Sequence, residues 1–304
     1  MLYILQTALE LGLVYGLIPL ALFLSYRILD VADLTTDGTF VLGMAVSVSL
    51  TSLGHPVLGI FAAMLSCAIA GGVTAMLQTI MGVPSILAGI ITNTGLYTIN
   101  LMAMGWSANI SLLKKDTIFT YVRELKIGGD WYRTIFLAVI IAIVVIFLIA
   151  FLHTRLGLSI RATGDNPEMI QSSSINPIFT ITVGLCLSNA LTGLSGALVG
   201  QMQKSADINA GTGIVVIGLA CLIIGETILS RKSISINCIA AVVGSIAYRF
   251  IYAIVLKTRI VPIECLKLLT AVIVALAIAM PTIKSNIALQ KQKAVHKNKK
   301  EVKE

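Results

Sequence analysis

Apolar stretches long enough to cross a membrane recur along this chain of 304 residues, from Leu5 to Met280. A helix needs ~20 residues to cross the ~30 Å hydrocarbon core of a bilayer. Charged residues make up only 12% of the sequence, too few to cover the surface of a water-soluble domain. Because the run at 134–152 shows no alternation of period two, it predicts helices and not a β-barrel. We therefore predict an all-α integral membrane protein of the cell membrane.

The apolar runs predict about nine transmembrane helices in a membrane domain of residues 1–280, followed by a basic tail of residues 281–304. The second and seventh spans are short for a complete crossing, so each is either a short span or a broken or re-entrant segment. The predicted spans lie at 5–28, 39–53, 57–80, 84–106, 134–153, 178–200, 213–229, 238–256 and 263–280.

Orientation follows from the basic residues that flank the spans. Seven lysines lie beyond Pro281, and a lysine-rich segment after a last span is typical of the cytoplasmic side. With nine crossings, the C-terminus is then cytoplasmic and the N-terminus lies outside. The same tail accounts for most of the net charge of +8, so this charge does not indicate a nucleic acid partner.

Two stretches with a similar spacing of glycines, residues 38–43 and 211–218, suggest an inverted repeat. In the nine-span arrangement the first begins a span at the cytoplasmic face, and the second begins a span at the outer face. Four spans then lie on each side of a central fifth span, an arrangement known from many transporters.

The sequence contains no recognisable arrangement of catalytic or metal-binding residues. It has no H-E-x-x-H, G-x-S-x-G or Walker A motif, so the chain does not hydrolyse ATP in the P-loop manner. The five cysteines and three histidines are scattered and predict neither disulfides nor a metal site. We expect a transporter without a cofactor of its own, powered by a partner protein or by an ion gradient.

The stretch 154–177, between the fifth and sixth predicted spans, carries the most specific local signal. Asp165 or Asn166 can cap a helix in which Pro167 is the first residue and Glu168 lies in the first turn. This pattern predicts a short amphiphilic helix near the membrane surface. An ordinary connection between two spans is the alternative interpretation.

The segment R-A-T-G-D-N-P-E at 161–168, followed by the small-residue stretch 191–200, resembles the permeases of branched-chain amino-acid ABC importers. The stretches 16–30 and 211–220 agree with the same family. The motif L-T-T-D-G-T-F at 34–40 is similar to the sub-branch associated with tryptophan and tyrosine uptake. The resemblance thus covers nearly the whole chain.

The resemblance implies a permease that forms a homodimer, with the translocation path at the twofold axis. Two cytoplasmic ATP-binding cassette ATPase subunits would bind the 154–177 segments. An extracellular solute-binding protein would deliver an amino acid, which is aromatic in the narrower assignment. The residues implied for the ATPase contact are Arg161, Gly164, Asp165, Asn166, Pro167 and Glu168.

The fourth predicted span contains three consecutive polar residues, Thr92, Asn93 and Thr94. A single polar residue in a membrane helix usually forms a hydrogen bond between helices, whereas three in a row point to more than one face. We predict that these residues line the substrate pathway, together with Asp37 and Thr39 of the T-D-G-T-F stretch. Hydrogen bonding between helices is the alternative role.

Charged residues inside the predicted spans are costly and face protein or water. Arg249 lies in the middle of the eighth span, and Glu226 near the inner end of the seventh. We expect Arg249 to snorkel or to pair with Glu226 or Glu264. In a rival interpretation, an ion-gradient-driven secondary transporter or channel, Arg249 and Glu226 would be ion or proton elements.

Overall fold

The computed structural model describes residues 2–113, 115–124, 129–172, 175–229 and 233–258, with 271, 272, 274, 275 and 279. The predicted ninth span lies largely outside these residues, and the basic tail, Glu264 and the loop residues 231–232 lie entirely outside them. The chain forms two compact units, Met1–Ala253 and Ile254–Glu304. Of the second unit, the structure describes the last turn of one helix and short helical pieces within 271–279.

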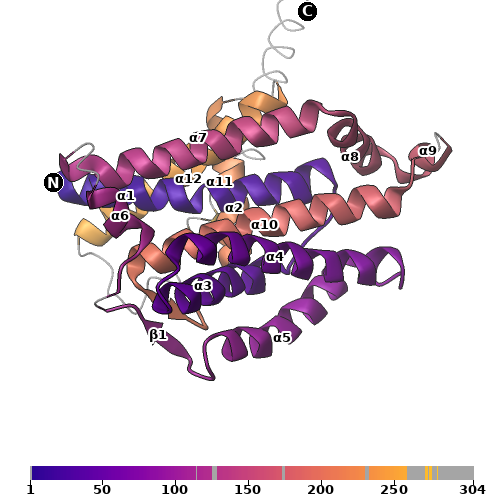
Figure 1. Ribbon diagram of the computed structural model, residues 1–304. Helices are drawn as coiled ribbons and strands as arrows, with labels where there is room; N and C mark the ends of the chain where they lie inside the picture. The colour runs from indigo at the N-terminus through magenta and orange to yellow at the C-terminus, as the bar shows by residue number, and fades with distance from the viewer. Residues whose placement is uncertain are drawn as a thin grey trace, which may run out of the picture. The chain divides into compact units, whose positions relative to one another are not determined.

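The described part is helical except for two short strands, which pair antiparallel with Ile110 opposite Ala206. The elements are α1 (Leu2–Tyr15), α2 (Leu17–Leu22), the π-helix η1 (Phe23–Ile28), α3 (Thr36–Ser52), α4 (Pro56–Thr79), α5 (Ser85–Ala103), β1 (Asn109–Ser111), α6 (Ile118–Glu124), the 3-10 helix η2 (Gly129–Trp131), α7 (Tyr132–His153), α8 (Arg155–Asp165), α9 (Pro167–Ser172), α10 (Pro177–Gln203), β2 (Ser205–Asp207), α11 (Ile214–Leu229) and α12 (Ile234–Thr258). Figure 1 shows their arrangement.

Six helices of the described part are long and apolar enough to cross a membrane, which confirms a multi-pass, all-helical membrane protein. They agree with six of the predicted spans, while the total of nine stays a prediction. The six are Tyr3–Ile28, Pro56–Thr79, Ser85–Ala103, Tyr132–His153, Pro177–Gln203 and Ile234–Lys257.

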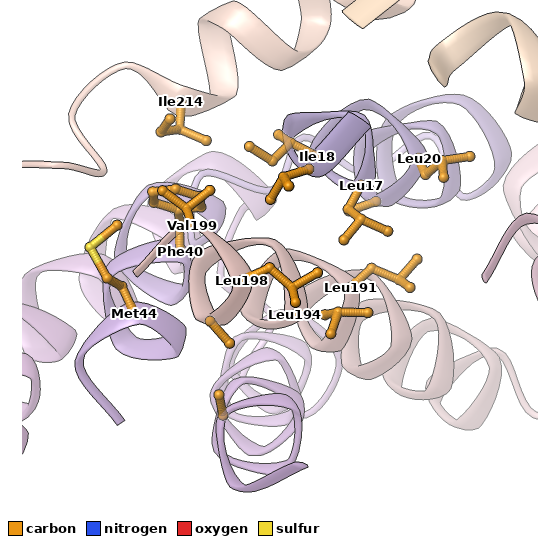
Figure 2. Close-up of a cluster of buried hydrophobic side chains, with 14 of the residues drawn as sticks. Leu17, Ile18, Leu20, Phe40, Met44, Leu191, Leu194, Leu198, Val199 and Ile214 are labelled. Atoms are coloured by element: carbon orange, nitrogen blue, oxygen red, sulfur yellow. The ribbon is translucent and has the colours of Figure 1, made fainter. Parts of the chain in front are cut away.

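The core of the first unit is built around α10. This helix contacts α2, α3 and α4, and leucines along it, including Leu191, Leu194 and Leu198, meet the side chains of α2 and α3 (Figure 2). Close approach is possible because α10 is rich in small residues. A Cβ on Gly196 would collide with the backbone carbonyl of Phe40, and Gly43 lies directly against the backbone of Gly193. The predicted small-residue stretch therefore serves helix packing.

The two short helices begin part-way along their longer neighbours. Near the start of α3, the Thr39 hydroxyl donates to Asn189 Oδ1 at 2.8 Å, and Asn189 lies near the middle of α10. The start of α11 places Gly218 against Ile18 of α2, inside the long Tyr3–Ile28 helix. Since α3 has 17 residues and α11 has 16, each extends only about 25 Å at 1.5 Å per residue.

The segment before α3 is not helical, and it runs beside α10. Leu29 contacts Gly184, and Asp33 accepts a hydrogen bond from Asn189 Nδ2 at 2.7 Å. The Asp33 carboxylate also accepts from the backbone N–H of Thr35 at 2.8 Å, which turns the chain into α3. The predicted second span thus coincides with α3, a short helix that follows a non-helical segment, while the choice between a short span and a broken or re-entrant segment stays a prediction.

Candidate functional site: a polar cavity where two short helices meet

The starts of α3 and α11 lie against each other, and Asp37 joins them. Its carboxylate accepts hydrogen bonds from the backbone N–H groups of Val215, at 2.8 Å, and Gly213, at 3.1 Å. Val215 lies in the first turn of α11 and Gly213 immediately precedes the helix, where N–H groups have no partner within the helix. Asp37 therefore caps α11 from another helix, and its negative charge suits the positive end of the helix dipole.

The two glycine-containing stretches were expected to begin spans at opposite faces of the membrane, and this stays a prediction. In the structure the helices that they begin meet at their starts, because Gly211 lies directly on the backbone carbonyl of Asp37 and leaves no room for a Cβ there. The inverted repeat itself stays a prediction.

A cavity of about 400 Å³ opens beside the joined helix starts. It brings together three of the predicted pathway residues, Asp37, Asn93 and Thr94, although they come from two different helices. The Thr94 side chain is exposed, and its hydroxyl donates to the carbonyl of Ile90 at 2.8 Å. Asn93 lies against Gly38, where any larger residue would collide with its amide oxygen. A polar cavity of this size suits a small polar solute.

The other two predicted pathway residues do not line this cavity. Thr92 lies on another face of α5, beside an apolar cavity of about 580 Å³ between α3, α4 and α5, and its hydroxyl donates to Ala88. Thr39 is buried and bonded to Asn189. Successive residues of a helix point about 100° apart, so adjacent polar residues reach different surroundings. These two positions have the geometry of the alternative role, hydrogen bonding within the bundle.

Two further residues of α5, Tyr97 and Asn100, line the cavity and were not predicted. Asn100 is 2% exposed. Its Nδ2 donates to the carbonyl of Gly38 at 3.2 Å, and its Oδ1 accepts from no described residue. With Asn93 they follow a spacing of i, i+4 and i+7, which is one face of a helix. That spacing was the signal in the sequence that could have found them.

The stretch 154–177 forms two helices instead of one. The cap of the second is Asn166, whose Oδ1 accepts from the backbone N–H of Glu168 at 3.0 Å, and that helix begins at Pro167 as predicted. Asp165 is not the cap, because it is the last residue of α8. The first helix, α8, begins at a further cap, Thr154, which accepts from Gly157 at 3.2 Å.

The six residues implied for the ATPase contact divide between a packed part and an exposed part. Gly164 of α8 lies on the backbone carbonyl of Ile28, at the end of η1, with no space for a side chain. Arg161 is half-buried. The four consecutive residues from Asp165 to Glu168 are exposed and form the tip between α8 and α9.

Two of the charged residues inside the helices make contacts that the structure describes. Glu226 pairs with Arg27, with 3.1 Å between Nε and Oε1. Arg249 stacks on Tyr15, its Cζ lying 3.7 Å from the ring centre, and the expectation that it snorkels or pairs with Glu226 or Glu264 stays a prediction, since Glu264 lies outside the described residues. Within the described ranges, no group of three or more His, Cys, Asp or Glu residues could hold a metal ion.

Comparisons with known proteins identify relatives of this chain. A tyrosine transport system permease protein of Clostridioides difficile (strain R20291) is 33% identical over 284 residues, covering 93% of this chain and 92% of the relative. The uncharacterized protein RP368 of Rickettsia prowazekii (strain Madrid E) is 32% identical over 284 residues, 91% of this chain and 97% of its own. A nucleoside ABC transporter permease protein, NupC of Lactococcus lactis subsp. cremoris (strain MG1363), is 33% identical over 94 residues, 30% of this chain and 28% of NupC. No solved structure matches the chain.

The family described as "Branched-chain amino acid transport system / permease component" matches residues 4–282, which include the two short helices α3 and α11 and the 154–177 stretch. A permease component is the transmembrane subunit of an ABC transporter and is not itself an enzyme. The chain therefore belongs to the branched-chain amino acid permease family of ABC transporters.

Proposed function

We propose that this chain is the permease subunit of an ATP-driven importer for an amino acid, and that its substrate passes the polar cavity at the starts of α3 and α11. The observation that carries the proposal is the cavity itself. It collects Asn93, Thr94, Tyr97 and Asn100 on one side and the capped start of α11 on the other. Broken helices that begin inside the membrane, with polar groups at their starts, are how many transporters build substrate sites.

An aromatic amino acid is the proposed substrate class. Two features support it, the likeness to a tyrosine transport permease over nearly the whole chain and the position of Tyr97, whose exposed ring lines the cavity. Aromatic rings stack with energies of ~0.5–1.5 kcal/mol beyond the burial of their area. The amide groups of Asn93 and Asn100 supply the polar contacts that such a substrate needs.

We further propose a homodimer with the path at its twofold axis. Only 22% of the apolar part of α5 is buried within the chain. Thr94 and Tyr97 both lie on its exposed side, so a second copy facing this side would close the cavity with matching residues. An isologous contact of this kind is the commonest symmetry of soluble protein dimers.

The exposed tip from Asp165 to Glu168 is the proposed contact with the ATPase, which the permease family requires as a partner, together with a solute-binding protein on the outer side. The proposed topology has nine spans, with the N-terminus outside and the tail cytoplasmic. Single cysteines test it, because a reagent added outside intact cells should label position 130 and not position 161. Labelling at 161 overturns both the orientation and the ATPase contact.

The decisive test of function is uptake of radiolabelled tyrosine by vesicles that contain the permease and its co-purified ATPase, supplied with the binding protein. We expect uptake when ATP is supplied on the side of the membrane where the ATPase is bound, and no uptake when a non-hydrolysable analogue replaces ATP. Uptake driven by a proton or sodium gradient without ATP would establish the rival, a secondary transporter or channel.

A further inference from the structure

A third cavity, of about 780 Å³, lies near the first residues of α1 and α7 and the last residues of α10. It shares no lining residue with the polar cavity of the proposed pathway. Glu10 belongs to its wall, and so do Trp131, Tyr132 and Arg133. With Tyr3, which also lines it, the cavity combines one carboxylate, one guanidinium group and three aromatic side chains.

Glu10 is a carboxylate inside a membrane helix, and it is only 6% exposed. Its Oε1 accepts hydrogen bonds from the Thr134 hydroxyl, at 3.0 Å, and from Gln6 Nε2, at 3.2 Å. No described residue donates to Oε2 or forms an ion pair with Glu10. A carboxylate held in such a place is costly unless a cation or further donors reach it. The Oε2 atom therefore offers an acceptor to a positively charged donor in the cavity.

Arg133 supplies the opposite charge in the same cavity. Its Nε donates to the Tyr132 hydroxyl at 3.0 Å, and its Cζ lies 5.6 Å from the centre of the Tyr132 ring. These contacts hold the guanidinium group without neutralising it, since none of the described carboxylates lies within ion-pair distance. Its remaining N–H groups suit an oxyanion, which guanidinium groups bind in pairs of hydrogen bonds.

We propose that this cavity binds a zwitterion with a primary ammonium group close to an oxyanion, the ammonium on Glu10 Oε2 and the oxyanion on Arg133. The headgroup of an ethanolamine phospholipid and a free amino acid both carry this chemistry. The position of Trp131, Tyr132 and Arg133 at the start of a span is typical of the lipid headgroup region. The cavity volume lies within the range of small-molecule sites.

The fluorescence of Trp131 reports directly on binding in this cavity. The chain has two tryptophans, and Trp106 is absent from the cavity wall, so Trp106→Phe leaves Trp131 as the only one. The purified full-length permease with this change is titrated in detergent, and its emission is followed with three probes: dihexanoyl phosphatidylethanolamine, dihexanoyl phosphatidylcholine and glycine. We expect a saturable change with phosphatidylethanolamine or glycine. Phosphatidylcholine should bind more weakly, because its methylated ammonium has no N–H to donate.

Glu10→Gln removes the charge and retains an oxygen for Thr134. It should weaken binding by about tenfold or more, the size expected for loss of a hydrogen bond to a charged group. The matched control is Glu124→Gln, because Glu124 is exposed and does not line the cavity; this variant should bind like the parent.

The probes separate the two sources. Saturation with phosphatidylethanolamine alone identifies a lipid site, and saturation with glycine alone identifies an amino acid site. The proposal is overturned if none of the probes gives a saturable change, or if Glu10→Gln binds them as tightly as the parent. If Glu10→Gln does not elute as a folded protein, Arg133→Gln takes its place, and unchanged binding by that variant is equally decisive against the proposal.

Discussion

Asp37 belongs to α3 and caps the start of α11. Replacing it by alanine should remove this cap and destabilise the protein. Two backbone N–H groups lose a carboxylate that now accepts from them at 2.8 and 3.1 Å. Hydrogen bonds to charged groups contribute ~1.5–3 kcal/mol each, and loss of a cap typically costs ~1 kcal/mol. Because both bonds share one half-buried carboxylate, we expect the free energy of unfolding to fall by about 3 kcal/mol in total.

Asp37→Asn gives a graded version of the same change. The amide keeps one acceptor oxygen, so one of the two bonds survives, while the charge at the start of α11 is lost. The remaining cost is one hydrogen bond and a charge–dipole interaction of ~0.3–1 kcal/mol, about 1–2 kcal/mol in total. The order parent, asparagine variant, alanine variant is therefore part of the prediction.

Denaturant unfolding of the purified permease in detergent measures these differences. Asp116→Ala is the matched control, because Asp116 is exposed and accepts no hydrogen bond from the described residues; it should change the unfolding free energy by less than ~0.5 kcal/mol. If Asp37→Ala unfolds at the same denaturant concentration as Asp116→Ala, the capping argument is wrong. If Asp37→Asn is as stable as the parent but transports nothing, the carboxylate contacts the substrate directly.

Three further changes test other parts of the structure. Replacing both Asn93 and Thr94 by leucine should abolish uptake while the complex still assembles on a sizing column; normal uptake would return them to a structural role. Asn166→Ala should cost only ~1 kcal/mol yet reduce ATPase co-purification, and an unchanged ATPase yield would count against the tip as the contact. Gly43→Ala should lower stability by ~1–3 kcal/mol because it collides with α10, whereas Gly95→Ala, in open space, should not.

Much of the helical plan could be read from the sequence, because the length of an apolar run limits what it can do in a membrane. The two short runs predicted short helices, and α3 and α11 have 17 and 16 residues, about 25 Å each at 1.5 Å per residue. The non-helical segment before α3 could not be predicted from the sequence. It is held beside α10 by the hydrogen bond between Asp33 and Asn189, residues separated by 156 positions in the chain.

The candidate site, too, could be predicted from the sequence only in part. Consecutive polar residues on α5 predicted a polar lining, and the structure places Asn93 and Thr94 in one cavity. The sequence does not reveal which face of a helix meets which cavity, so it could not show that Thr92 lies beside a different cavity from Asn93 and Thr94. The role of Asp37 as a cap was likewise hidden, because its partner Val215 is 178 residues away. Local patterns specify helices, but contacts between distant segments specify what their polar residues do.

The contacts around η1 give the proposed importer a short physical connection between its ATPase-facing side and its cavity. Gly164 of α8 rests on the carbonyl of Ile28, where η1 ends. The non-helical segment 29–35 starts there and leads directly into α3, whose second residue, Asp37, holds the start of α11. A π-helix is often found at functional sites within longer helices. A shift of α8 would act on the segment 29–35 through the contact of Gly164 with Ile28, and on α10 through the hydrogen bond between Thr163 and Thr180 at 2.8 Å, so motion at the proposed ATPase contact can reach the cap of α11 by two routes.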